Sequence, residues 1–305
     1  MKKMLITGVS GFIGSHVCMH FKNKGYITYG IGRKESSIFQ LENTRLDYLK
    51  VSDVSIASIL EFNQKFDVIV HCGGSGSVGN SVEFPYNDFK KTVNGTLEVL
   101  EYIRLFNENA HLIYPSSPAV QGECHNEPIK ESYIGKPASP YGFHKKIAEN
   151  LCQSYAEKYY LNVSIIRLFS VYGIGLEKQI LWDAYHKIDI ANKEVTFFGT
   201  GNETRDFIHI DDVVNLFENI LLKNNKFIII NGGTGLNKTI RYTVEAIKKL
   251  MKKDLVINFD NKLSVGNPIF YCADTTETDK YINKNKVVFE DGLKESIKWM
   301  KNNSA

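Results

Sequence analysis

The chain of 305 residues lacks several features that mark specialised classes of protein. It has no run of roughly 18–20 apolar residues, so we expect no membrane-spanning helix. It has only seven prolines and no repeat, low-complexity linker or proline-rich spacer. Its small net charge of +3 comes from interspersed acidic and basic residues. We therefore expect neither a nucleic acid nor a membrane as a partner.

Cysteine is scarce as well, and its arrangement predicts neither disulfides nor a metal site. The five cysteines are scattered without the spacing of a zinc site: Cys18, Cys72, Cys124, Cys152 and Cys272. Free thiols in a reducing compartment are the simplest interpretation, so we expect a cytoplasmic protein. We expect His16 and His20 to lie on the surface or to pack against neighbouring residues. We expect His144 to point to a different helix face from Tyr141 and Lys145. No metal ligand set emerges.

What the sequence does contain is a regular alternation of strand-like and helix-like segments. Hydrophobic residues make up 43% of the chain and charged residues 23%, as in an ordinary globular core. Apolar runs separated by amphipathic stretches predict strands at Met4–Ile6, Tyr26–Ile31, Tyr48–Val51, Val68–His71, Leu112–Tyr114, Val163–Leu168 and Phe227–Ile230. This alternation predicts an α/β fold with a Rossmann-type, doubly wound parallel sheet.

The pattern loosens after about Gly173 and predicts a second, smaller lobe. We expect a dinucleotide-binding Rossmann domain over residues 1–172, completed by about 203–232. A substrate-binding lobe is expected over 173–202 and 233–305. Helices are predicted in this lobe from Tyr242 to Lys252 and from Gly292 to Lys301.

A glycine-rich turn joins the first predicted strand to the first helix. Its predicted cofactor-binding residues are Gly8, Ser10, Gly11, Phe12, Ile13 and Gly14. Glycines at this place let the backbone approach a pyrophosphate at the positive end of a helix. The alternative is an ordinary tight turn, but the position after the first strand of an alternating fold favours a dinucleotide.

The end of the second strand carries no carboxylate, although one there usually binds the adenosine 2′-OH of NAD. Gly32 leaves room for a 2′-phosphate, and Arg33 can neutralise it. We therefore expect NADP(H) in preference to NAD, the alternative being a solvated basic turn at Arg33 and Lys34. Asp53 and Val54, after the third strand, are predicted to contact the adenine.

A serine, a tyrosine and a lysine form the predicted catalytic group. Ser117 follows a buried strand, and Tyr141 and Lys145 lie four residues apart on one helical face. Lys145 can lower the pKa of the phenol, and Tyr141 can exchange a proton with the oxygen of a carbonyl or alcohol. Ser117 can bind the same oxygen. Tyr-x-x-x-Lys is common on helices, so by itself it is weak evidence for catalysis. It becomes strong evidence because a nucleotide-binding turn precedes it in the chain.

Together these residues resemble the extended short-chain dehydrogenases/reductases of the sugar-nucleotide epimerase/dehydratase type. The resemblance covers nearly the whole chain. It also includes the segments 71–74, 93–96, 139–142, 167–173, 199–201 and 205–212. It implies NAD(P) as the cofactor and a nucleotide-diphosphate sugar as the substrate. It further implies a homodimer that pairs two helices, one from about Tyr86 and one from Tyr141.

The resemblance also implies roles for single residues outside the central motifs. Gly73 and Val171 would contact the cofactor, and Ser170 the substrate, together with Ser117 and Tyr141. Arg205 would clamp the substrate diphosphate, a task suited to a guanidinium fork. Its alternative is a structural arginine bonded to backbone.

Departures from the family pattern narrow the range of reactions that we expect. Dehydratases of this type have Asp-Glu after the catalytic Ser/Thr, whereas Pro118-Ala119 follow Ser117, so dehydration is not expected. Thr92, Gln121 and Ser170 replace common family residues, and 264–267 lack a second phosphate-binding arginine. These changes leave the sugar and the nucleotide open.

The leading hypothesis is an NADPH-dependent reductase of a nucleotide-linked 4-keto sugar, often a 4-keto-6-deoxy sugar, in sugar-nucleotide biosynthesis. The Gly32-Arg33 strand end motivates it, because a reductase consumes reduced cofactor. The alternative is an NAD-dependent nucleotide-sugar 4-epimerase. The catalytic residues do not separate the two. A third hypothesis is a scaffold that binds NADP(H) without turnover, against which the complete catalytic group argues.

Overall fold

The computed structural model describes residues 1–33, 46–122, 127–223, 225–262, 269–282 and 286–303. Lys34, Cys124 and the 264–267 segment therefore lie outside the described residues. The chain divides into two compact units, each described by itself below. The first comprises Met1–Gly122, Ile134–Leu168 and Val214–Ile230; the second comprises Glu123–Tyr133, Phe169–Val213 and Asn231–Ala305.

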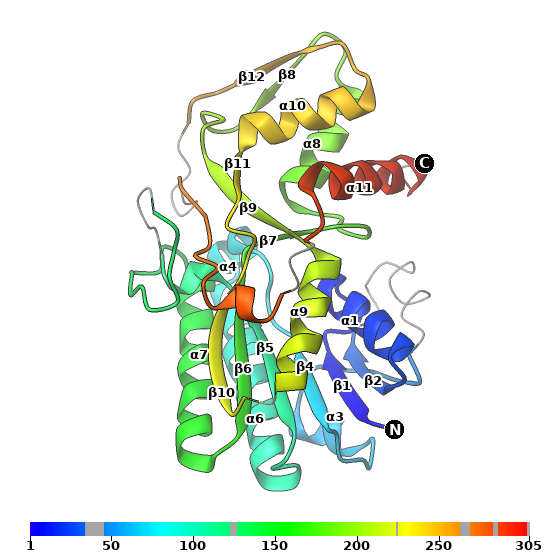
Figure 1. Cartoon of the computed structure of the whole chain (residues 1–305), viewed down its shortest axis with the longest axis vertical. Helices are drawn as coiled ribbons and strands as arrows, with labels where there is room; N and C mark the ends of the chain where they lie inside the picture. The colour runs from blue at the N-terminus through cyan, green and yellow to red at the C-terminus, as the bar shows by residue number, and fades with distance from the viewer. Residues whose placement is uncertain (34–45, 123–126, 224, 263–268, 283–285, 304–305) are drawn as a thin grey trace. The chain divides into compact units, whose positions relative to one another are not determined.

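The first unit is built on a seven-stranded sheet of described residues with the order β10-β6-β5-β4-β1-β2-β3 (Figure 1). Its strands are β1 (Lys3–Thr7), β2 (Ile27–Gly32), β3 (Tyr48–Val51), β4 (Val68–His71), β5 (His111–Ser116), β6 (Asn162–Leu168) and β10 (Phe227–Gly232). The pairs from β6 through β3 are parallel. The strand order reverses between β1 and β4, and at such a point ligands bind beside the carboxyl ends of the strands.

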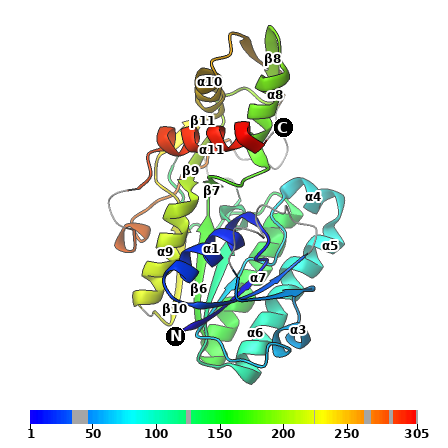
Figure 2. The ribbon, with the colours of Figure 1, turned by 90° about the vertical axis from the view of Figure 1, so that its right-hand side faces the viewer.

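Helices cover both faces of this sheet. They are α1 (Phe12–Asn23), α3 (Ile56–Leu60), α4 (Val78–Glu83), α5 (Pro85–Phe89), the π-helical segment η1 (Lys90–Asn94), α6 (Gly95–Phe106), α7 (Pro140–Tyr159) and α9 (Ile210–Lys223). One apolar core joins α3, α6 and α7 to the strands. Figure 2 shows α1 and α9 on the other face, where His20 of α1 lies 2.7 Å from Glu218 of α9.

The strands are continuous apolar runs because the sheet is buried on both faces. Met4, Leu5 and Ile6 of β1 have no exposed surface, and neither have Ile69 and Val70 of β4. The predicted strands and the Rossmann-type α/β fold are confirmed.

Helix α7 is held on the sheet by a buried ion pair. Arg167 of β6 donates from Nε to Oε1 of Glu149 at 3.0 Å and from Nη2 to Oε2 at 2.8 Å. Only 9% and 6% of the two side chains are exposed. The forked geometry fixes the position of the helix along the strand, since both hydrogen bonds must form together. Ser139 caps the start of the helix by accepting from the Gly142 N–H at 3.3 Å, and Pro140 occupies the first turn.

The described residues of the second unit form two small sheets and a group of helices. The sheets are β11-β9-β7 and β12-β8, formed by β7 (Ser170–Tyr172), β8 (Glu194–Phe197), β9 (Thr204–His209), β11 (Asn237–Thr239) and β12 (Val256–Phe259). The helices are α8 (Gln179–Ile190), α10 (Ile240–Met251) and α11 (Phe289–Asn303), which pack on one another. The indole rings of Trp182 and Trp299 lie 6.0 Å apart between α8 and α11.

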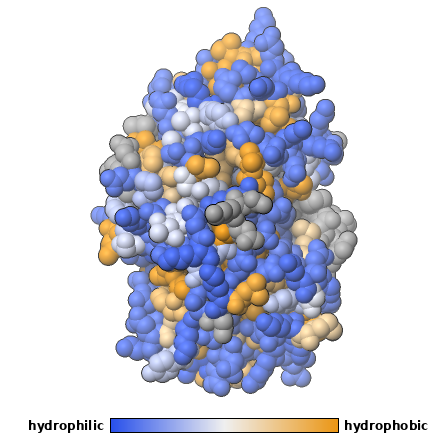
Figure 3. Space-filling view, viewed as in Figure 1, coloured by the Kyte–Doolittle hydropathy of each residue, from blue (hydrophilic) through white to orange (hydrophobic). Residues whose placement is uncertain are grey.

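The unit boundaries differ from the predicted ones. Residues 169–172 and 203–213 belong to the second unit, because β7 and β9 pair with each other and not with the large sheet. The predicted division into dinucleotide and substrate roles stays a prediction. Among the described residues, no helix is long and apolar enough to cross a membrane. Figure 3 shows a mostly hydrophilic surface with separate apolar patches on the face seen in Figure 1.

The Glu149–Arg167 pair supplies a test of the fold. We expect Glu149→Gln to lower the free energy of unfolding by about 3–5 kcal/mol, because it leaves a buried guanidinium without its counter-charge. Urea denaturation followed by circular dichroism measures the change. The matched control is Glu277→Gln, which removes a carboxylate from an exposed ion pair with Lys280 and should change stability by less than about 0.5 kcal/mol. Equal effects of the two variants would contradict this role for the buried pair.

Candidate active site

The turn between β1 and α1 is packed so tightly that only glycine fits. Gly8 has a φ of +66°, and a Cβ there would lie 2.6 Å from the carbonyl oxygen of Cys72. A Cβ on Gly14 would lie 2.3 Å from the carbonyl oxygen of Gly8. Among the residues that the structure describes, no side chain caps the start of α1, where Gly11 is the N-cap and Phe12 the first residue. The turn therefore offers uncapped backbone N–H groups to an anion, which fits the pyrophosphate of a dinucleotide.

The end of β2 is closed to larger side chains. A Cβ on Gly32 would lie 2.7 Å from Oγ of Ser10, so no carboxylate fits there without a shift. The next residue, Arg33, donates from Nη2 to Oδ1 of Asp53 at 2.9 Å. Both side chains are largely exposed, at 50% and 84%. The structure thus brings the predicted phosphate-binding arginine and the predicted adenine-binding aspartate together as an ion pair.

The end of β4 lies against the glycine turn. The N–H of Gly73 donates to Oγ1 of Thr7 at 3.0 Å, and the same oxygen lies 2.6 Å from Nδ1 of His71. Burial lowers the pKa of His71 to about 3, and the nearby Lys145 ammonium acts in the same direction. His71 is therefore neutral near pH 7 and orders this strand end. Val54 packs beside Gly73, as a Cβ on that glycine would lie 2.9 Å from Cγ2 of Val54.

Tyr141 and Ser117 meet at the end of β5. Tyr141 is half-buried in the first turn of α7, and its N–H donates to Oγ of Ser81 in α4 at 3.0 Å. Burial raises the pKa of the Tyr141 phenol to about 12, a side-chain hydrogen bond with Ser117 opposes this rise, and the Asp88 carboxylate adds to it. Oγ of Ser117 also accepts from the Ala119 N–H at 3.2 Å. The two side chains can thus bind one oxygen atom of a ligand.

Lys145 lies one turn further along α7 and is buried. Its Nζ donates to the carbonyl oxygen of Pro115 at 2.9 Å and lies 4.6 Å from the centre of the Tyr114 ring. A Cβ on Gly74 would lie 3.8 Å from the same nitrogen. Burial lowers the pKa of Lys145 to about 8. Because α7 carries both residues, Lys145 and Tyr141 reach the carboxyl ends of β4 and β5 together.

The remaining predicted residues lie in the second unit. Ser170 and Val171 of β7 pair with Phe207 and Ile208 of β9. Arg205 of β9 donates from Nη1 to the carbonyl oxygen of its neighbour Thr204 at 2.7 Å, as the structural alternative for this residue expects. Burial lowers its pKa.

Asp206 is a residue whose importance the sequence did not reveal. Its buried carboxylate accepts from the N–H groups of Thr234, Gly235 and Ala273 at 2.8, 2.9 and 3.0 Å. It thereby ties the strand that carries Arg205 to two distant loops. The only signal was its place in the 205–212 motif, which gives no partner.

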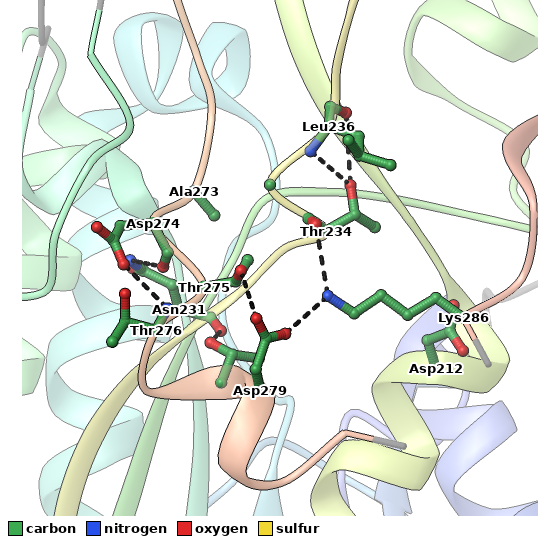
Figure 4. A network of polar contacts seen from close by, with 12 residues as sticks. Asp212, Asn231, Thr234, Leu236, Ala273, Asp274, Thr275, Thr276, Asp279 and Lys286 are labelled. Atoms are coloured by element: carbon green, nitrogen blue, oxygen red, sulfur yellow. Dashed lines mark hydrogen bonds and ion pairs between the residues drawn. The ribbon is translucent and has the colours of Figure 1, made fainter. Parts of the chain in front are cut away.

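The loops held by Asp206 are also joined to each other (Figure 4). Lys286 donates from Nζ to Oδ1 of Asp279 at 3.0 Å and to the carbonyl oxygen of Thr234 at 3.4 Å. The Thr275 hydroxyl donates to Oδ2 of Asp279 at 2.9 Å. This network stabilises the surroundings of Arg205 within the second unit. In the part of the chain that the structure describes, no cluster of His, Cys, Asp and Glu could hold a metal ion.

Comparisons with known proteins place these features in one family. The profile of the NAD dependent epimerase/dehydratase family matches residues 4–233. A putative UDP-glucose 4-epimerase of Methanocaldococcus jannaschii is 28% identical over 309 residues, covering 99% of each chain. A UDP-glucuronate 4-epimerase of Thermodesulfobacterium geofontis is 28% identical over 314 residues, covering 98% of this chain and 96% of the relative.

A solved structure shares the fold as well. It is the UDP-glucuronic acid 4-epimerase of Bacillus cereus in complex with UDP-glucuronic acid and NAD. The two chains superpose with a TM-score of 0.86 at 26% identity, covering 98% of this chain and 99% of the other. The predicted resemblance is thereby confirmed.

The glycine turn supplies a test of cofactor binding. We expect Gly14→Ala to weaken NAD binding at least about tenfold, or about 1.4 kcal/mol, because the new methyl group forces α1 away from Gly8. Isothermal titration calorimetry measures the affinity. The control is Gly79→Ala in α4, where the nearest atom to a Cβ is Oγ of Ser77 at 4.0 Å. Unchanged NAD affinity in a folded Gly14→Ala variant would contradict the assignment.

Proposed function

This chain belongs to the NAD dependent epimerase/dehydratase family, and we propose that it is a nucleotide-sugar 4-epimerase that keeps NAD bound. The observation that carries the proposal is the grouping of Ser117, Tyr141 and Lys145 at the carboxyl ends of β4 and β5. The 4-epimerases among its relatives support it further, since they extend over nearly the whole chain. The predicted alternative, epimerisation, thus has better support than the predicted main function, reduction.

The proposed mechanism assigns a proton transfer to Tyr141. NAD, when bound, would supply the hydride acceptor, and the turn from Gly8 to Gly14 would hold its pyrophosphate. Tyr141 takes the proton of the sugar C4 hydroxyl as hydride leaves C4, and returns the proton to the same oxygen as hydride adds to the opposite face of the C4 carbonyl. Ser117 donates a hydrogen bond to that oxygen. The Lys145 ammonium favours the phenolate, because an opposite charge nearby lowers the pKa of a phenol.

The backbone beyond Ser117 argues against dehydration. Pro118 starts a short 3₁₀ turn to Val120, and the Ala119 N–H points back to Oγ of Ser117. Neither Pro118 nor Ala119 offers a carboxyl group for the elimination of water. Transfer of a proton at one carbinol oxygen is therefore the reaction that these side chains support.

The choice of NAD depends on the charge around Arg33. Gly32 and Arg33 favour NADP(H), and with it the reductase, as a second candidate. However, Asp53 pairs with Arg33 and offsets its charge, so a 2′-phosphate would meet a carboxylate as well as a guanidinium. This pairing weakens the electrostatic argument for NADP(H). For the substrate we propose a nucleotide-diphosphate sugar whose diphosphate binds Arg205.

An apolar face on the helices supports the proposed homodimer. Phe143 and Ile147 of α7 are exposed at 45% and 39%, and Leu97 of α6 at 38%. Tyr86 of α5 and Phe84 before it are exposed at 71% and 51%. Large apolar side chains on adjacent helices are typical of protein interfaces. A second copy of the chain is the partner that the family resemblance implies.

The proposed reaction is tested with purified protein and a panel of UDP-hexoses without added cofactor. We expect interconversion of C4 epimers, and release of about one NAD per chain on denaturation. Tyr141→Phe should reduce kcat by at least about a thousandfold while NAD content stays the same, because only the proton transfer is lost. Tyr159→Phe, which alters an exposed tyrosine on the same helix, is the control and should keep full activity.

Four results would overturn this proposal. Loss of absorbance at 340 nm only with added NADPH and a 4-keto sugar would favour the reductase. Release of NADP in place of NAD would do the same. Full turnover by Tyr141→Phe would refute the mechanism, and absence of any turnover with bound cofactor would favour a scaffold.

The dimer is tested by light scattering on the size-exclusion column. We expect twice the 34.6 kDa mass of the chain. Phe143→Asp should shift the protein toward the monomer, because it places a charge in the apolar face. Asn202→Asp, at an exposed polar position outside these helices, is the control. A monomeric wild-type protein at micromolar concentration would contradict the proposal.

A further inference from the structure

A buried aspartate–histidine pair lies beside the candidate catalytic helix. Asp88 of α5 is 3% exposed, and its Oδ2 lies 2.5 Å from Nδ1 of His144 in α7. The ring of Phe89 meets the imidazole edge to face at 5.3 Å and fixes its orientation. The other carboxylate oxygen, Oδ1 of Asp88, is buried and has no hydrogen-bond partner among the described residues. A buried carboxylate with only one partnered oxygen is unusual, because burying an unpaired polar atom is unfavourable.

The field of this carboxylate reaches both residues of the proposed acid/base pair. Helices α4 and α5 pack on α7, and the backbone of Tyr141 is bonded to Ser81 of α4. The Asp88 charge contributes to the raised pKa of Tyr141, after burial, and counteracts the burial that lowers the pKa of Lys145. Asp88 and Lys145 are buried and Tyr141 is half-buried, so water and salt screen their interactions less than those of surface charges.

We propose that Asp88 and His144 are positioning residues that set the pH range over which Tyr141 acts as a base, an inference that rests on the proposed function. With His144 neutral, the full negative charge of Asp88 opposes formation of the Tyr141 phenolate. With His144 protonated, the ion pair offsets that charge and the phenolate forms more readily.

Other charged groups near the pair do not replace it. Glu83, Lys90 and Lys91 on the neighbouring helical segments are exposed, so water and salt screen them. On α7, the Glu149 carboxylate is held by Arg167. Burial raises the pKa of the Cys72 thiol to about 12, so this residue near Lys145 is uncharged at neutral pH. Among the described residues, Asp88 is therefore the buried carboxylate near Tyr141 that has no lysine or arginine as its ion-pair partner.

Two variants should move the pH profile of kcat/KM in opposite directions. The acidic limb reports the pKa of the base in the enzyme before substrate binds. Asp88→Asn removes the negative charge, so the phenolate is favoured and the limb should shift to lower pH by about half a unit or more. His144→Gln keeps a donor to Asp88 but cannot carry a positive charge, so the limb should shift to higher pH.

The control is Glu83→Gln, which removes an exposed carboxylate from α4 and should leave the limb in place. Opposite shifts of the two test variants support the proposal. A fall in kcat/KM that is equal at every pH, with no shift of the limb, would show a purely structural role and overturn it. Shifts in the same direction would overturn it too.

A second measurement needs no substrate and separates this inference from the proposed function. The phenolate absorbance of the NAD-bound protein is titrated with pH, and the Tyr141→Phe variant is subtracted to isolate Tyr141. The midpoint should fall in Asp88→Asn and rise in His144→Gln. These shifts would support the pair even if no sugar is epimerised, and unchanged midpoints would overturn it even if epimerisation is found. If Asp88→Asn fails to fold, His144→Gln still decides the outcome.

Discussion

The fixed position of α7 on the sheet is the constraint on which the candidate site depends. Arg167 forms a buried ion pair with Glu149 near the middle of the helix, and Lys145 donates a hydrogen bond to the Pro115 carbonyl at the end of β5. Both contacts are buried, so slipping of the helix would leave charged groups without partners inside the protein. The position of Tyr141 follows from these contacts, because Tyr141 lies one turn before Lys145 on the same helix. The proposed acid/base pair is therefore placed by the core as much as by its own interactions.

A second constraint is the close approach of backbones where the strand order reverses. Gly8 brings β1 against the end of β4, and Gly14 brings α1 against Gly8. The same packing places Gly73 next to Thr7 and so aligns the strand ends on either side of the reversal. Because parallel strands end at one edge, the anion-binding turn and the candidate catalytic group share that edge. This geometry suits a dinucleotide whose nicotinamide must reach Tyr141.

Much of the first unit could be predicted from the sequence, since parallel strands buried on both faces are continuous apolar runs. The second unit could not be predicted in the same way. Its strands β7, β9 and β11 are three to six residues long and contain several polar residues, so they leave a weak pattern. The residues of the candidate site also divide into those that the sequence predicts and those that it does not. Gly8, Tyr141 and Lys145 stand in spaced motifs, whereas Asp88 and Asp206 are single aspartates with no signal of their partners.

The sequence by itself determined the candidate residues: a glycine turn suited to a dinucleotide, and a tyrosine and a lysine spaced for the proposed proton transfer. Both are local, since a few neighbouring residues specify them. Only the tertiary structure decided which distant charges share one environment. It paired Arg33 with Asp53, which offsets the charge that favoured NADP(H), and set the Asp88–His144 pair beside Tyr141. Electrostatic energy depends on distance and burial, and neither can be read from the order of residues along a chain.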